Sequence, residues 1–375
     1  MLQRKGGANS AESDLASDLP YAAASTREPL MLNLPSEAAS APDIDAGFPA
    51  KEGSLTKFRY HPAMSSGSEK LRHLLWCGTA GAAAIAFLMC YLSGLSLTRG
   101  SHTLVVAVAL LAVGCVVVVP SRTGTNARSL LALEGLLLFM VMSTLGAVLS
   151  YLAMRHSSGY ADTLLHRWDQ SMGFSWPSVW SEVHRHGWLF SVLDSAYSAC
   201  FVMPFILFAA LWRTNEIERL HRFLLAYGLA LVATVAIFFF LPARAAFAFY
   251  QAGAQLPENA QHYGGIISSL RDGSLTVLDL QDLGGIITFP SFHAAMAILF
   301  IWGVWPVRLL RVPIGSINAL MWIAAVPIGG HYIVDVLAGS AIAGATILTS
   351  GYLACRAPAA RLTISAEAVL EEQTA

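Results

Sequence analysis

GGHYIVDVLAGSAIAGATILTSGYLAC, residues 329–355, is the stretch that decides the class of fold. Its first seven residues include a histidine and an aspartate, and residues 336–355 then carry no charged side chain. A helix needs about 20 apolar residues, at a rise of about 1.5 Å per residue, to cross the hydrocarbon of a bilayer. The stretch therefore predicts a membrane-spanning helix that begins beside a polar motif.

The composition of the whole chain is that of a multi-span membrane protein. Of its 375 residues, 55% are hydrophobic and only 13% are charged, with a mean hydropathy of +0.56. Soluble domains carry about 25% charged residues. A formal net charge of −1 argues against a nucleic-acid binder. The five cysteines lie in or beside apolar runs without a CxxC spacing, which argues against a disulfide framework or a zinc ribbon.

Eight apolar runs predict an all-α integral membrane protein with about eight transmembrane helices, because backbone polar groups find no water in the hydrocarbon. The runs cover approximately residues 74–97, 103–120, 131–154, 188–212, 223–243, 290–306, 315–330 and 332–355. Between them, residues 155–187 mix tryptophans with charges and are expected to lie in the membrane interface. Residues 244–289 are expected to form a polar loop. Residues 1–70 are rich in Ala, Ser, Pro and Asp and predict a disordered tail.

The distribution of Lys and Arg predicts the orientation. With the N-terminus inside, 17 of the 23 basic residues fall on the cytoplasmic side of eight spans. We therefore expect a multi-pass protein with both termini in the cytoplasm, in the cytoplasmic membrane if the cell is bacterial. The runs 290–306 and 332–355 then begin on the extracytoplasmic side, where the run 223–243 ends.

Two polar motifs lie at these run ends, FPSFH at 289–293 and GGHYIVD at 329–335. A single histidine at the end of a span is most often a helix cap or an interfacial residue. Two such histidines at one face, one of them with a carboxylate four residues later, indicate function, because ionisable groups near a bilayer core are costly. Pro290 in the first helical turn leaves N–H groups directed outward, where an anion can bind.

These residue types fit phosphoryl transfer. His331 and Asp335 share a helix face, so the carboxylate can fix the imidazole tautomer and leave the other ring nitrogen as a nucleophile or base. His293 can give a proton to a leaving group. Arg244, just after the fifth run, offers a planar guanidinium that suits phosphate oxygens. A competing interpretation is an iron or zinc site made of the two histidines and Asp335.

The PSFH and GGHYIVDVLAG segments resemble the second and third signature motifs of the type 2 phosphatidic acid phosphatase superfamily. FPSFHAA together with HYIVDVLAG is most similar to the inositol phosphotransferase branch, which includes the inositol phosphorylceramide synthases. The resemblance implies a six-helix core at residues 129–356 with its signatures at the extracytoplasmic face. Residues 71–128 would then be two additional N-terminal helices, and residues 357–375 a cytoplasmic tail.

By the same resemblance, His331 is the nucleophile, Asp335 its orienting partner and His293 the acid that protonates the leaving oxygen. The substrate-binding residues would be Arg244, Ser291 and Gly330. No metal or cofactor is implied. The chain departs from the superfamily pattern at three points: Ala324 and Ala325 stand where a Ser-Arg pair is usual, Phe292 replaces a small residue, and the KxxxxxxRP first motif is missing.

The sequence thus predicts a metal-independent membrane phosphatase or phosphotransferase that acts on a lipid-linked phosphate or phospholipid head group through a phosphohistidine. Two alternatives stay open. One is a transporter with a proton relay, and the other is an inactive family member, because fewer anion donors are visible than the pattern requires. The acceptor (water, inositol, a ceramide or a glycan), the lipid and the oligomeric state are left open.

Overall fold

The computed structural model describes residues 66–118, 124–250 and 258–355, and nearly all of its regular structure is helical. The expected helical fold is therefore confirmed. Most of the predicted N-terminal tail and all of the predicted C-terminal tail lie outside the described residues. The last residues of the former, from Ser66, are already part of the first helix.

Four described helices are long and apolar enough to cross a membrane. They are α1 (Ser66–Leu92), α3 (Gly124–His156), α8 (Ile217–Phe240) and α13 (Ile333–Cys355). A fifth candidate is a broken span in which α6 (Gly187–Ser198) and α7 (Met203–Arg213) meet at 56° through the short turn η2 (Ala199–Phe201).

The three remaining runs also coincide with helices, but these do not meet the same criteria of length and composition. They are α2 (Arg99–Val118), α11 (Phe292–Val304) and α12 (Arg311–Ala324), with the turn η3 (Arg308–Leu310) between the last two. The structure thus supports four or five spans in the described residues, and the full set of eight stays an expectation.

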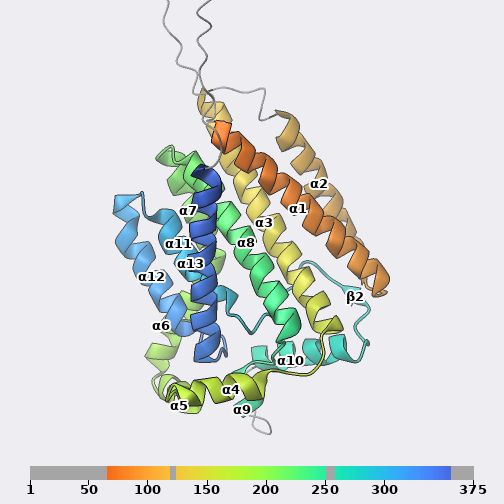
Figure 1. Ribbon diagram of the computed structural model, residues 1–375, viewed down its shortest axis with the longest axis vertical. Helices are drawn as coiled ribbons and strands as arrows, with labels where there is room; N and C mark the ends of the chain where they lie inside the picture. The colour runs from red at the N-terminus through yellow and green to blue at the C-terminus, as the bar shows by residue number, and fades with distance from the viewer. Residues whose placement is uncertain (1–65, 119–123, 251–257, 356–375) are drawn as a thin grey trace, which may run out of the picture. The chain divides into compact units, whose positions relative to one another are not determined.

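The helices pack around α8, which runs between α3 and α13 (Figure 1). Aromatic side chains fill this centre, with the rings of Phe139 and Tyr227 4.5 Å apart and those of Phe223 and Phe300 5.7 Å apart. At the start of α1, the guanidinium of Arg72 pairs with the buried carboxylate of Glu134 on α3 at 2.8 Å. Removing one partner of such a pair leaves an uncompensated buried charge, so α1 is fixed to the core.

Short elements lie across one end of the long helices (Figure 1). They are α4 (Asp162–Ser171), α5 (Trp176–Arg185), α9 (Ala246–Tyr250) and α10 (Glu258–Arg271). A short parallel pair joins β1 (Ser96–Leu97) to β2 (Val277–Leu278). The expectation of a loop at 244–289 was thus wrong in part. Helix α10 forms because Ile267 and Leu270 are buried in a cluster with residues of α3, a face too narrow to stand out in a polar segment.

Candidate active site

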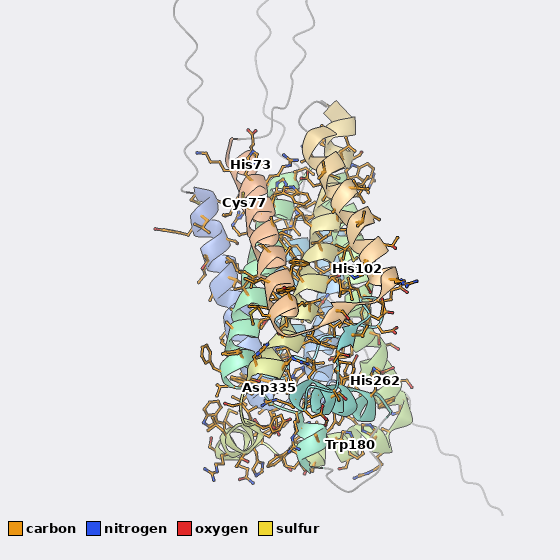
Figure 2. All side chains as sticks on the ribbon, turned by 90° about the vertical axis from the view of Figure 1, so that its right-hand side faces the viewer. His73, Cys77, His102, Trp180, His262 and Asp335 are labelled. Carbon is orange, nitrogen blue, oxygen red and sulfur yellow. The ribbon has the colours of Figure 1, made fainter. Side chains whose placement is uncertain are left out.

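Both sequence motifs lie at starts of helices that meet at one place. Helix α11 begins after Ser291, and α13 begins after the turn that carries His331. Asp335 lies in the half of the molecule that also holds Trp180 and His262, away from His73 and Cys77 (Figure 2). The end of the helices that carries the motifs is therefore the end crossed by α4, α5, α9 and α10.

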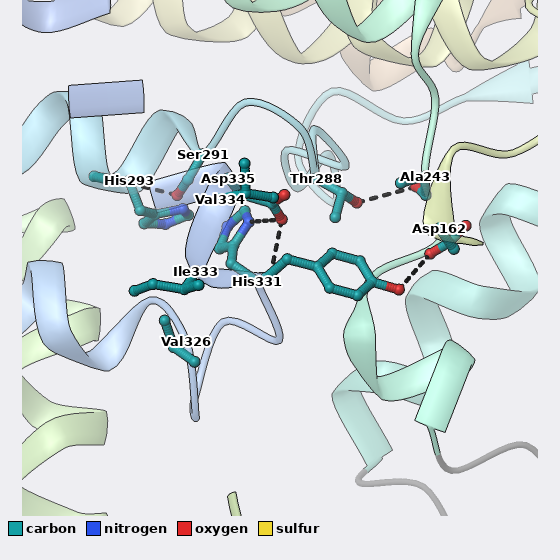
Figure 3. A network of polar contacts seen from close by, with 12 residues as sticks. Asp162, Ala243, Thr288, Ser291, His293, Val326, His331, Ile333, Val334 and Asp335 are labelled. Atoms are coloured by element: carbon teal, nitrogen blue, oxygen red, sulfur yellow. Dashed lines mark hydrogen bonds and ion pairs between the residues drawn. The ribbon is translucent and has the colours of Figure 1, made fainter. Parts of the chain in front are cut away.

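His331 and Asp335 form the pair that their spacing predicts. Nδ1 of His331 lies 3.3 Å from Oδ2 of Asp335, and the same oxygen accepts the backbone N–H of Tyr332 at 3.0 Å (Figure 3). The backbone N–H of His331 donates to the carbonyl of Ala325 at 3.1 Å. Both side chains are buried, at 3% and 0% exposure. The imidazole is thus held on one side, with Nε2 directed away from the carboxylate.

Burial makes the neutral form of this imidazole the favoured one. It lowers the pKa of His331 to about 4, while a hydrogen bond to the backbone of Thr288 acts in the opposite direction. The free histidine side chain has a pKa of about 6.5. The ring is therefore unprotonated at neutral pH, as a nucleophile must be.

His293 faces this pair from α11. The ring centroids of His293 and His331 are 6.4 Å apart, and Figure 3 shows the two rings side by side. The hydroxyl of Tyr197 lies 3.1 Å from Nδ1 of His293, and the two rings stack at 4.3 Å. A neutral His293 that accepts the Tyr197 hydroxyl proton at Nδ1 carries its own proton on Nε2, whereas a protonated His293 carries one on each ring nitrogen and can donate the Nε2 proton. Tyr197 was not among the predicted site residues.

Ser291 links the two helices instead of pointing into open space. Its hydroxyl caps α11 by accepting the N–H of Ala294 at 3.3 Å, and its own N–H donates to the carbonyl of Asp335 at 2.9 Å. On the facing helix, a Cβ added to Gly339 would lie 2.1 Å from the Ser291 carbonyl oxygen. The close crossing of α11 and α13 therefore requires a glycine there. A role for Ser291 in substrate binding stays a prediction.

Gly330 has a backbone conformation that few other residues adopt. Its φ is +68°, and its carbonyl accepts the N–H of Ala246 at 2.8 Å. A Cβ at this position would lie 2.1 Å from the ring of Phe247. Gly330 thus lets the chain turn into His331 while α9 packs directly against it. Substrate binding by this residue also stays a prediction.

Gly330→Ala is expected to unfold more easily than the wild type and to lose activity. A left-handed residue with a side chain costs about 1–2 kcal/mol, and the clash with Phe247 adds about 1–3 kcal/mol. Gly159→Ala is the matched control, because Gly159 has a φ of +65° but nothing within 4 Å of the added atom. Thermal unfolding in detergent should show the larger loss for Gly330→Ala. Equal losses would contradict the packing described for Phe247.

Arg244 comes close to the site with its main chain and not with its guanidinium. Its N–H donates to both carboxylate oxygens of Asp162, at 3.2 and 3.1 Å. Its guanidinium carbon lies 4.8 Å from the centroid of the Tyr160 ring, which Arg271 also approaches at 4.6 Å. No interaction between the Arg244 side chain and either histidine occurs among the described residues. Arg244 as an anion clamp stays a prediction that needs a different rotamer.

Two buried carboxylates of α4 complete the site, and the sequence interpretation missed both. Asp169 accepts the N–H groups of Ile333 and Val334, each at 3.1 Å. Asp162 accepts the hydroxyl of Tyr332 at 3.1 Å (Figure 3). Burial raises the pKa of both carboxyl groups, and these hydrogen bonds counteract it. The first N–H groups of α13 are therefore occupied by a protein carboxylate.

The candidate metal interpretation finds no support in the arrangement of side chains. Within residues 66–118, 124–250 and 258–355, no group of three or more His, Cys, Asp and Glu side chains is arranged to hold a metal ion. What the geometry brings together is a buried His–Asp pair and a second imidazole. This arrangement can supply a nucleophile and a proton donor.

The comparisons with known proteins agree with the motifs at the level of a superfamily. No curated protein and no solved structure matches the chain. One family model matches, over a stretch that begins in α4, ends in α13 and leaves out α1 and α2. Members of this family are generally phosphatases or phosphotransferases. The stretch that holds both histidines and Asp335, residues 163–349, is thus a match to the PAP2 superfamily.

Proposed function

We propose that this protein is an integral membrane phosphatase or phosphotransferase that acts on a lipid-linked phosphate or a phospholipid head group. The observation that carries the proposal is the buried His331–Asp335 pair, with its second imidazole 6.4 Å away between ring centroids. The match to the PAP2 superfamily suggests a phosphatase or phosphotransferase for phosphate esters. The apolar helices that carry the site suggest a substrate that resides in the membrane.

In the first step, the unprotonated ring nitrogen of His331 attacks phosphorus. The bond between phosphorus and the leaving oxygen breaks, and His293, in its imidazolium form, gives its Nε2 proton to that oxygen and becomes neutral. Asp335 stabilises the positive charge that develops on the His331 ring, as a carboxylate does for a histidine in other catalytic groups. The product is a phosphohistidine on His331 and a free alcohol.

In the second step, water or an alcohol attacks the phosphohistidine. His293, now without its proton, takes one from the attacking hydroxyl, and the bond between phosphorus and nitrogen breaks. His331 is restored in its neutral form. From a phosphate monoester, attack by water releases free phosphate. From a phospholipid, the phosphohistidine still carries the head group, and attack by an alcohol such as a ceramide transfers that head group, as in the inositol phosphotransferase-like branch.

The phosphate oxygens would be held at the start of α11. The side chain of Asp169 already accepts the first two N–H groups of α13, so that helix start offers no free donors there. At α11, the Ser291 side chain accepts the N–H of Ala294, and the N–H groups of Phe292 and His293 in the same first turn would be the donors to phosphate. Arg244 would join them once its exposed side chain leaves Tyr160.

The proposed function is tested with purified protein and a panel of labelled phospholipids, with and without acceptor alcohols. Release of free phosphate indicates a phosphatase, and transfer of the label to an added alcohol indicates a phosphotransferase. If neither occurs with any lipid, while the protein is folded, the transporter and the inactive family member become the better interpretations. A chelator such as EDTA should leave activity intact, because the nucleophile is an imidazole.

The site is proposed to face the extracytoplasmic side, with both termini in the cytoplasm. In a background without the five native cysteines, His262→Cys in α10 should react with a membrane-impermeant maleimide in intact cells, and Arg308→Cys should react only after permeabilisation. A charged reagent cannot cross the hydrocarbon, so reactivity reports the side on which each residue lies. The reverse labelling pattern would place the site in the cytoplasm.

A further inference from the structure

Helix α4 binds the start of α13 through a carboxylate that no sequence motif marks. Both oxygens of Asp169 are used, one for the N–H of Ile333 and one for the N–H of Val334, each at 3.1 Å. Helix starts leave such N–H groups without intrahelical partners. Asp169 is fully buried, and its partners lie more than 160 positions later in the chain. The cap of α13 is thus supplied by a different helix.

A second carboxylate of α4 holds the residue between His331 and Ile333. Asp162 accepts the hydroxyl of Tyr332 at 3.1 Å, and it also accepts the N–H of Arg244. Tyr332 is fully buried, and its own N–H donates to Asp335 at 3.0 Å. The turn is therefore held on one side by the orienting carboxylate of the His–Asp pair and on the other side by α4.

None of the hydrogen bonds described for Asp162 and Asp169 involves the His331 ring itself. Residues on both sides of His331 are fixed, because Gly330 is bonded to Ala246 and Tyr332 is bonded to Asp162. A shift of about 1 Å in a reacting group can cost about 10²-fold in rate. The orientation of the His331 ring therefore depends on the position of α4.

We infer that Asp162 and Asp169 are positioning residues, which hold the turn 330–335 so that His331 is aligned for attack on phosphorus. This inference rests on the proposed function of the same site. It assigns to α4 a part in the reaction, beyond its expected place in the membrane interface.

The hydrogen-bond donors and acceptors that each substitution leaves predict which variant loses the most activity. Two N–H groups need two acceptor oxygens, and Asp169→Asn has one oxygen and one NH₂ group, so a donor must face a donor. Asp162→Asn can still accept the Tyr332 hydroxyl with its single oxygen. Tyr332→Phe removes that one hydrogen bond and keeps the ring. The loss should thus be greatest for Asp169→Asn.

The test measures the rate of phosphohistidine formation in a single turnover, per folded molecule. Asp169→Asn should lower this rate about 10²-fold with a much smaller change in KM. Asp162→Asn and Tyr332→Phe should each have a smaller effect, because the asparagine oxygen can still accept the Tyr332 hydroxyl and Tyr332→Phe removes a single hydrogen bond. Thr163→Ala and Gln170→Ala, at exposed positions of α4, are the matched controls and should match the wild type.

A second readout is independent of turnover. Diethyl pyrocarbonate modifies unprotonated imidazoles, and mass spectrometry can follow its reaction at each histidine. In Asp169→Asn, His331 should react faster than in the wild type, while the exposed His262 serves as the internal reference. The positioning role would be overturned if the rate of Asp169→Asn fell only in proportion to the fraction of unfolded protein and His331 reacted with diethyl pyrocarbonate no faster than in the wild type.

The two readouts separate the two proposals. If the wild type transfers no phosphate but His331 becomes accessible in Asp169→Asn, α4 does hold the turn around His331, but the proposed function fails and with it a part of α4 in phosphoryl transfer. If the wild type is active and Asp169→Asn matches Gln170→Ala in both readouts, the positioning role fails and the proposed function stands.

Discussion

His331→Ala should abolish turnover of every phosphate ester, whatever its leaving group. Without the imidazole, no covalent intermediate can form, and a better leaving group cannot replace a missing nucleophile. We expect a loss of at least about 10⁴-fold, as for essential residues of other nucleophilic sites. Steady-state assays with a lipid phosphate and with a nitrophenyl ester measure it.

Two further variants separate the loss of the nucleophile from the loss of the fold. His331→Gln keeps a polar side chain of similar size beside Asp335 and should be equally inactive. Asp335→Asn keeps the nucleophile and changes its tautomer, so activity should fall strongly without vanishing. Residual activity of His331→Ala on the nitrophenyl ester, comparable to that of the wild type, would contradict the role of His331.

His293→Ala should have the second largest effect, and this effect should depend on the leaving group. A general acid contributes about 10²–10⁴-fold when the leaving oxygen needs a proton. Turnover of a lipid substrate with a poor leaving group should fall by that factor. A nitrophenyl ester leaves without protonation, so its turnover should stay close to that of the wild type.

Tyr197→Phe is the matched control for His293. It removes the hydroxyl 3.1 Å from Nδ1 and keeps the ring that stacks on the imidazole. We expect a smaller loss than for His293→Ala, with the same dependence on the leaving group. Equal losses of His293→Ala on both substrates would mean that His293 acts in the attack and not in the departure of the leaving group.

The residues at the centre of the site could be predicted from the sequence because they are local or lie in motifs. A spacing of four residues places Asp335 beside His331, and the structure has the two side chains 3.3 Å apart. The topology from charge counting placed the starts of the two motif-bearing runs at one face. The structure does bring His293 to His331, although the side of the membrane is untested.

The contacts around this centre could not be predicted, because they join segments far apart in the chain. Asp162 and Asp169 have no motif around them, and their partners lie more than 160 residues later, apart from Arg244. One signal was present: the two carboxylates and Leu165 share the buried face of α4. Charged residues on the apolar face of an amphipathic helix indicate partners.

The apolar runs do not correspond one to one to helices long enough to span a membrane. Apolar composition identified every long helix, but it does not say where a helix breaks. The run 188–212 bends by 56° near Val202 before Pro204 in the first turn of α7. The run 290–306 yields a helix of 13 residues, because Pro306 cannot continue the α-helical hydrogen bonds. The apolar runs read from the sequence are therefore longer than the helices that they form.

The most direct test of the account is to trap the covalent intermediate. Protein is mixed with a labelled phosphate ester, denatured in alkali within one turnover, and digested, and the labelled peptide is identified by mass spectrometry. The account predicts an acid-labile, alkali-stable label on His331, absent from His331→Ala and more abundant relative to turnover when the second step is slowed. Label on His293, or normal turnover of wild-type protein with no labelled histidine at any time point, would contradict it.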